Sequence, residues 1–303
     1  MHNLNRRDML AVSGAATLGS LLGPSVLSHA ADETPKRILM FTRSAGYEHS
    51  VIRREGDQLS HAERVLTDLG AAHGIEVVAT KDGRIFDDDI EPWDAFFFYT
   101  TGVLTDTSPK DDGSQPMSPA GKERLLAAVA AGKGLIGSHC ASDTFHSAGP
   151  AQERQLQPDP FIAMLGGEFI IHGPQQKAGQ IVVDNHFPGA TKLGRSFNLN
   201  EEWYSLKNFP DDLHVILAQD TQGMQSDGYK RPPYPTTWAR MHDQGRVFYT
   251  SMGHREDVWT NAEIFQPLLL GGINWALGRV DADVTPNIAQ ATPGARALPT
   301  LGG

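Results

Sequence analysis

Cysteine, long apolar runs and basic residues are all scarce in this sequence. Cys140 is the single cysteine among 303 residues, which excludes an internal disulfide and leaves histidine and carboxylate side chains as the main ligands for any bound metal. Beyond residue 30 no uninterrupted run of about 20 apolar residues occurs, so no membrane-spanning helix is expected in the mature protein. The 26 basic residues are outnumbered by 36 acidic ones, and the net charge of −10 argues against a nucleic-acid partner.

The overall composition is that of an ordinary globular protein. Hydrophobic residues make up 40% of the chain and charged residues 20%, which is enough apolar material for a sizeable core and excludes a disordered or collagen-like chain. Histidine is abundant, with 12 residues against the one cysteine. The histidines are therefore the first place to look for chemistry.

The first 30 residues have the pattern of a twin-arginine signal peptide. Arg6 and Arg7 precede a weakly apolar stretch, residues 9–27, and Ser28-His29-Ala30 provides a cleavage site of small residues. A basic N-terminal helix or a membrane anchor is the alternative, but three glycines and a proline interrupt the stretch. We expect residues 1–30 to be removed and the protein to be periplasmic, or otherwise exported through the twin-arginine pathway.

Strand and helix patterns alternate in the first half of the mature chain. Short apolar runs predict strands at 37–42, 75–79, 95–100 and 134–137, and periodic apolar positions predict helices at 52–73 and 121–131. This alternation predicts a parallel α/β sheet with its ligand site at the carboxyl ends of the strands. The second half is richer in strands, expected at 180–184, 213–218, 236–240 and 246–251, with a last helix at 262–277.

We expect one domain in this chain, at residues 36–279. No internal repeat is visible, and residues 280–303 are rich in Pro, Ala, Thr and Gly with almost no periodicity. This last segment is expected to be a flexible C-terminal tail.

The segment 134–146 has the layout of a nucleophile elbow. A strand ends in Gly137-Ser138-His139 and turns sharply, which places the side chain of His139 at the exposed point of the turn. Cys140 follows one residue later, where the turn would aim it elsewhere. It is either an activated thiolate or a small buried hydrophobic residue, and its position favours the second interpretation.

Histidines and carboxylates also follow several other strands or apolar runs. Asp143 and His146 share the loop of His139, and His172 lies in a Gly-Pro turn. A bound metal normally has three or four ligands, so the residues of this one loop could bind a metal only together with ligands from other segments. The predicted ligands of a divalent metal, zinc or similar, are His139, His172, Glu202 and His254.

A series of motifs in the same order resembles a known family. The matching pieces are Thr42–Ser50, Gly134–His139, Leu165–Phe169 with His172, Asn185–Pro188, Glu201–Tyr204, Pro235–Arg240 and Gly245–His254. Together they resemble the ThuA-like (trehalose utilisation) domain family, whose fold is that of class I glutamine amidotransferases. The resemblance implies a single-domain, three-layer α/β sandwich with a mostly parallel, flavodoxin-like central sheet.

The resemblance also implies a loss of the amidotransferase reaction. In glutamine amidotransferases the elbow residue is a cysteine, and a late His-x-Glu completes the catalytic triad. His254-Arg255-Glu256 keeps that late spacing, but His139 stands in the place of the nucleophile. A true glutamine amidotransferase is therefore not expected.

ThuA-like proteins are associated with disaccharide and keto-sugar metabolism, so the resemblance implies a sugar substrate. Aromatic side chains could stack on pyranose rings, and nearby carboxylates and arginine could bind hydroxyls. The predicted substrate contacts are Tyr47, Asp143, His146, Glu202, Trp203, Tyr204 and Arg255. For Trp238 and Tyr249, which lie within strands, a place in the core is the better interpretation.

The main hypothesis is an exported enzyme that acts on a disaccharide or a 3-keto-glycoside by isomerisation, elimination or hydrolysis, assisted by a metal. The predicted catalytic residues are His139 and His254, with Glu201 or His49 as the base that removes a proton beside the ketone. One alternative is a periplasmic carbohydrate-binding protein without catalysis. Another is a hydrolase or amidotransferase-like enzyme that uses Cys140. The sequence leaves the sugar, the bond attacked and the oligomeric state open.

Overall fold

The computed structural model describes residues 35–107 and 111–300, which belong to one compact unit. The expected signal peptide, residues 1–30, lies outside the described residues. None of the helices in the described part of the chain is long and apolar enough to cross a membrane.

A nine-stranded mixed sheet forms the centre of the unit, in the order β2-β1-β3-β4-β11-β10-β9-β6-β7. The first five strands in this order are parallel to one another. They are β2 (Ile75–Thr80), β1 (Lys36–Phe41), β3 (Ala95–Phe98), β4 (Gly134–Ser138) and β11 (Gly245–Thr250). Most of their side chains are buried on both faces, as expected for strands covered by helices on both sides.

From β11 onward the sheet is antiparallel. It continues through β10 (Tyr234–His242), β9 (His214–Gln219), β6 (Gln176–Val182) and β7 (Ser196–Glu201). Two further strands, β5 (Glu168–His172) and β8 (Tyr204–Lys207), pair separately and antiparallel. The predicted single-domain α/β fold is confirmed, with the parallel part of its sheet confined to the strands from β2 to β11.

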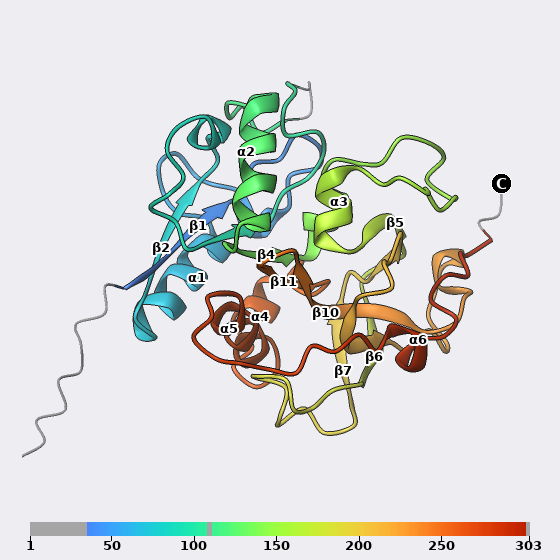
Figure 1. The fold of residues 1–303 in the computed structure, drawn as a ribbon. Helices are drawn as coiled ribbons and strands as arrows, with labels where there is room; N and C mark the ends of the chain where they lie inside the picture. The colour runs from blue at the N-terminus through green and yellow to red at the C-terminus, as the bar shows by residue number, and fades with distance from the viewer. Residues whose placement is uncertain (1–34, 108–110, 301–303) are drawn as a thin grey trace, which may run out of the picture. The chain divides into compact units, whose positions relative to one another are not determined.

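Helices cover both faces of the sheet (Figure 1). Helix α1 (His61–Ala72) contacts α4 (Glu256–Trp259), which contacts α5 (Phe265–Ala276), and these lie below the parallel strands β1, β4 and β11 in the view of Figure 1. Helix α2 (Pro119–Ala130) contacts α3 (Pro160–Leu165) above them. The connections also contain the 3-10 turns η1 (Ser50–Ile52), η2 (Gly83–Phe86), η3 (His139–Asp143) and η4 (Asp227–Tyr229).

Helix α1 begins nine residues later than the apolar periodicity predicts, at His61 rather than at residue 52. The reason is a capping box: the Ser60 side chain accepts from the Glu63 backbone N–H, and the Glu63 carboxylate accepts from the Ser60 N–H. The same buried carboxylate accepts hydrogen bonds from Thr42 and Arg54. Glu63 therefore fixes the start of α1 against the end of β1.

The C-terminal segment packs against the body over its described residues, where the sequence suggested a flexible tail. It contains a short helix, α6 (Ile288–Ala291), and buries Ile288 and Ala295. Asn287 hydrogen-bonds both the N–H and the carbonyl oxygen of Val215 in β9. These contacts with the backbone of β9 form only in the folded protein. Apolar periodicity, which is low in this segment, therefore does not predict them.

Gly137 provides a direct test of how tightly the end of β4 is packed. A Cβ at this position would lie 2.8 Å from Cδ1 of Leu165 and 3.0 Å from Cδ2 of Tyr249. We expect Gly137→Ala to lower the free energy of unfolding by about 1–3 kcal/mol through overpacking, measured by urea unfolding. Gly179→Ala in β6 is the control and should cost less, because its nearest neighbour is the flexible Asp220 side chain at 3.3 Å. Equal stability of G137A and the wild type would contradict this account.

Candidate metal centre and cavity

Four side chains from four separate segments meet near the carboxyl ends of the parallel strands. His49 follows β1, His139 follows β4, His254 follows β11, and Glu202 lies between β7 and β8. Each offers one ligand atom, and these atoms all lie within 4.8 Å of one another. Three imidazoles and one carboxylate form a ligand set typical of zinc and similar divalent metals.

His139 occupies the turn that the elbow pattern predicts. Its φ angle is +45°, a left-handed conformation uncommon for a residue with a side chain, and the ring is fully buried. Nδ1 lies 3.0 Å from the Ser251 carbonyl oxygen, which can only accept, so Nδ1 carries the hydrogen. In the neutral ring Nε2 then presents a lone pair to the cluster, as a metal ligand requires.

Glu202 lies at the centre of the histidines. Its Oε2 is 3.1 Å from Nδ1 of His254 and 3.6 Å from Nε2 of His139, and its Oε1 is 3.3 Å from Nδ1 of His172. Burial alone would raise the pKa of this carboxyl, but the nearby imidazoles of His139 and His254 outweigh burial and hold the pKa well below its ordinary value. Glu202 is therefore ionised over the whole physiological range.

His49 is almost fully buried, and its ring is held in the neutral state. Burial and the neighbouring His139 and His254 hold the pKa of His49 well below its ordinary value. Its Nε2 lies 3.3 Å from the Tyr204 hydroxyl and 3.9 Å from Oε2 of Glu202, while its Nδ1 is buried with no hydrogen-bond partner among the described residues. Neutral imidazoles and an ionised carboxylate are the forms that bind a cation, so these residues fit a divalent metal.

Glu201 supports this group from behind. Its buried carboxylate accepts hydrogen bonds from the backbone N–H groups of Glu202, Gly253 and His254 at 3.0–3.1 Å. Burial raises the pKa of Glu201 to about 7 despite these bonds. Glu201 has no exposed surface, and it does not line the cavity that opens beside the cluster and is described below. It therefore positions Glu202 and His254 rather than facing a substrate.

Gly253 allows His254 to approach the cluster. Its φ angle is +121°, which favours glycine, and its carbonyl oxygen accepts from the Tyr99 hydroxyl and from Nε1 of Trp259. Trp259 is fully buried. Trp203, a predicted substrate contact, is fully buried as well, as are Trp238 and Tyr249. These rings form the core behind the site.

A cavity of about 400 Å³ opens beside the cluster. It is lined by Tyr47, His49, Asp143, Phe169, His172, Glu202 and Tyr204. Tyr47 is 67% exposed at its surface, whereas the Tyr204 ring lies against His139 with the ring centres 4.2 Å apart. Aromatic faces beside carboxylates are the surfaces that bind sugar rings and their hydroxyls.

The structure brings together most of the residues that the sequence singled out, but some of them have other roles than the predicted ones. His49, a predicted base, joins the group of four that could hold a metal, and His172, a predicted ligand, contacts Glu202 from the cavity side. Arg255 lies at a neighbouring hollow, paired with Asp257 and Gln175. Phe169 and Gln175 were not singled out from the sequence, although Phe169 belongs to one of the matching motifs.

Cys140 is fully buried in the turn behind His139. Burial raises the pKa of its thiol well above the ordinary value, so the thiolate form is disfavoured. Its surroundings are those of a small core residue.

A second group of charged residues begins at the cavity. His146 lies between two carboxylates, with Nε2 2.5 Å from Oδ1 of Asp143 and Nδ1 3.2 Å from Oε1 of Glu168. The hydrogen bonds to Asp143 and Glu168 raise the pKa of His146 to about 9. Burial alone would raise the pKa of Glu168, but hydrogen bonds from His146 and Ser147 outweigh burial and lower it to about 2.

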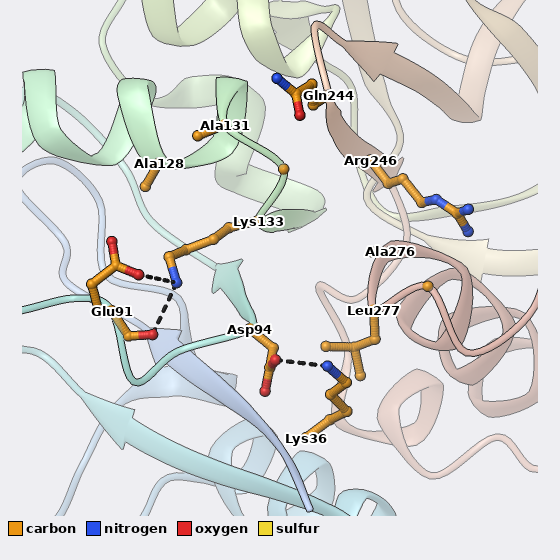
Figure 2. A pocket seen from close by; sticks show the side chains of 12 residues that line it. Lys36, Glu91, Asp94, Ala128, Ala131, Lys133, Gln244, Arg246, Ala276 and Leu277 are labelled. Atoms are coloured by element: carbon orange, nitrogen blue, oxygen red, sulfur yellow. Dashed lines mark hydrogen bonds and ion pairs between the residues drawn. The ribbon is translucent and has the colours of Figure 1, made fainter.

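A polar pocket also lies at the opposite, amino-terminal end of the parallel strands. Figure 2 shows Lys36 paired with Asp94, and Lys133 with Glu91, across this pocket. Arg246, on its rim, pairs with Asp281. Because these cations already have partners and ligands of α/β sheets bind at the carboxyl ends, we assign the functional site to the histidine cluster.

The charged group around His146 predicts a pH dependence of stability. The pKa of His146 is raised from 6.5, so its contribution is complete below about pH 6.5 and is lost as the pH rises through about 9. The pKa of Glu168 is lowered from 4.5, so its contribution is complete above about pH 4.5 and is lost as the pH falls toward 2. The wild type should therefore exceed His146→Gln in stability most between about pH 4.5 and 6.5.

Urea unfolding of both proteins at about pH 5.5, 7.5 and 9.5 measures this difference. The exposed His186 supplies a matched control, since His186→Gln should leave the pH profile nearly unchanged. A stability difference between wild type and H146Q that does not shrink toward pH 9.5 would show that His146 is not held as an imidazolium.

Comparison with known proteins places the chain in a family. The family model for ThuA, trehalose utilisation, matches residues 37–276. A ThuA-like protein of Bacteroides uniformis is 18% identical with a TM-score of 0.55, covering 84% of this chain and 96% of its own. One of Parabacteroides merdae is 17% identical with a TM-score of 0.52, covering 85% and 96%. At these identities the two structures show the fold alone. No curated protein matches the chain. Because the family model spans most of its length, the chain belongs to the ThuA (trehalose utilisation) family.

Proposed function

We propose that the protein is an exported enzyme of carbohydrate metabolism that acts on a disaccharide or a 3-keto-glycoside with the help of a divalent metal. The observation that carries this proposal is the group His49, His139, Glu202 and His254 beside a cavity with aromatic and carboxylate walls. Family membership supports a sugar as the substrate class. The twin arginines and small-residue cleavage pattern of residues 1–30 support export.

The proposed ligands are held in place before any ion binds. Ser251 orients His139 through its carbonyl oxygen, and Glu201 fixes the backbone of Glu202 and His254. Such outer contacts fix the ring orientation of metal-binding histidines.

A 3-keto-sugar suits this site because a ketone acidifies the neighbouring C–H bond. A divalent cation, when bound, polarises a carbonyl oxygen and so stabilises the negative charge that develops on it. The chain's own contribution is to place the sugar. Tyr47 and Phe169 offer ring faces for its C–H groups, and Asp143 offers a carboxylate for a hydroxyl or an acidic C–H. Removing a proton beside the ketone leads to isomerisation or to elimination of the glycosidic substituent.

Metal analysis of the purified protein, combined with His139→Ala, tests this proposal. We expect the wild type to carry about one divalent ion per chain and H139A to bind it at least ~10-fold more weakly, since even loss of an outer contact costs ~10–100-fold. Turnover of 3-keto-disaccharides should fall in H139A and in the chelated wild type. His186→Ala, which changes an exposed histidine, is the matched control and should keep both metal and activity.

Two results would overturn the proposal. One is full turnover by metal-free protein, and the other is unchanged activity in H139A. Saturable sugar binding without any product from intact or 3-keto disaccharides would instead identify a carbohydrate-binding protein.

A further inference from the structure

Two carboxylates line the cavity within the described part of the chain, and they differ in their partners. Glu202 lies within the histidine cluster, whereas Asp143 lies outside it at the end of η3. Oδ1 of Asp143 accepts a hydrogen bond from His146, and Oδ2 has no hydrogen-bond partner among the described residues. One oxygen of Asp143 is thus available to a molecule in the cavity.

His146 and Glu168 hold Asp143 in a fixed orientation. The imidazole of His146 donates to carboxylates on both sides, which requires a hydrogen on each nitrogen and hence a positive charge. Its raised pKa agrees with this charge. Glu168 is buried and is itself held by Ser147, by Asn208 at 2.7 Å and by Lys207 at 3.7 Å. This arrangement limits the rotation of the Asp143 side chain.

We propose that Asp143 is the general base of this site, and that His146 and Glu168 are the positioning residues that aim it. The inference rests on the proposed function, because the reaction needs a sugar with an acidic C–H bond in the cavity. The other carboxylate that sequence reasoning offered as base, Glu201, is buried behind the cluster and bonded to three backbone N–H groups.

The step transfers one proton and no other atom. Oδ2 of Asp143 takes the proton from the carbon next to the ketone, the electron pair of that C–H bond forms a C=C bond, and the carbonyl oxygen takes up the negative charge. The neutral carboxylic acid can return the proton to the same carbon. In an isomerisation it protonates the former carbonyl carbon instead, while the hydroxyl proton of the neighbouring carbon passes to the former carbonyl oxygen and leaves a new carbonyl group behind. No oxidant or reductant is needed. A positioned base of this kind contributes about 10²–10⁴-fold to the rate.

His172 is the rival base on the same cavity. Its Nδ1 lies 2.9 Å from the Gly173 carbonyl oxygen and 3.3 Å from Oε1 of Glu202, so Nδ1 carries the hydrogen and Nε2 can accept a proton. The ring is 43% exposed, and its contact with Glu202 gives it a place in the support of the cluster. Asp143 is favoured because the charged chain that runs through His146 to the buried Glu168 orients it. The experiment separates the two.

Exchange of the C–H proton with solvent reports proton removal without requiring complete turnover. The probe is methyl 3-keto-α-glucoside in D₂O, followed by proton NMR, with its spontaneous exchange subtracted. We expect Asp143→Asn to lower the enzyme-dependent exchange rate about 10²–10⁴-fold while probe affinity, measured by calorimetry, stays within a few-fold of the wild type. Asparagine keeps an acceptor for His146, so the fold should tolerate this change.

Matched variants complete the design. Glu153→Gln removes an exposed carboxylate of a nearby loop and should exchange at the wild-type rate. His146→Gln leaves the carboxylate of Asp143 in place but removes the cation that orients it, so the exchange rate should fall about tenfold with little change in affinity. This variant provides the test if D143N does not fold. His172→Gln tests the rival base, and it should lower the exchange rate less than D143N does.

Each outcome is decisive. Wild-type exchange that is lost in D143N and kept in E153Q supports the assignment. Wild-type rates in D143N, or in H146Q if D143N does not fold, overturn the assignment of Asp143 and leave the proposed function standing. Absence of exchange in the metal-loaded wild type overturns the proposed 3-keto-sugar chemistry and the role of Asp143 with it.

Discussion

The carboxylate of Glu202 lies within 3.9 Å of nitrogens from four histidines, and the architecture of the site follows from this one contact group. A partly buried carboxylate is costly unless charge or hydrogen bonds offset its desolvation. The histidines supply that compensation from three strand ends and from the small sheet of β5 and β8. Glu201, next in the chain, fixes the backbone on both sides of the contact. The cluster therefore connects the parallel and the antiparallel parts of the protein through contacts with a single carboxylate.

The elbow at the end of β4 shows how a familiar backbone can carry a different chemistry. The strained φ of His139 is what a nucleophile elbow requires, yet the side chain there is an imidazole whose Nε2 faces other ligands. Cys140, one residue later, is buried with a raised thiol pKa. The geometry that would expose a nucleophile instead places a ligand at the carboxyl edge of the sheet, close to His254 from the neighbouring β11.

The sequence predicts those parts of the site that depend on local pattern. His139 and His254 each follow a strand whose apolar run is visible, and parallel neighbours bring their carboxyl ends together, so their meeting follows from topology alone. The choice between His49 and His172 does not follow in this way. His49 follows β1 and His172 ends β5, and only the packing of Tyr204 and the position of Glu202 decide which ring enters the group.

Burial was the other property that local pattern could not supply. Glu201 and Trp203 alternate in sequence with Glu202 and Tyr204, which have similar chemistry. Glu201 and Trp203 have no exposed surface, whereas Glu202 and Tyr204 line the cavity. The start of α1 at a capping box and the docking of α6 on β9 likewise depend on side-chain contacts that apolar periodicity does not contain.

The central claim is that four side chains from separate segments hold one divalent ion beside a sugar-sized cavity. Anomalous diffraction at the zinc edge from crystals of the zinc-loaded protein tests it most directly. The account predicts one strong peak about 2.0–2.2 Å from a nitrogen of each of His49, His139 and His254 and from an oxygen of Glu202. No peak at this position, or a peak bound by His172 in place of His49, would contradict it.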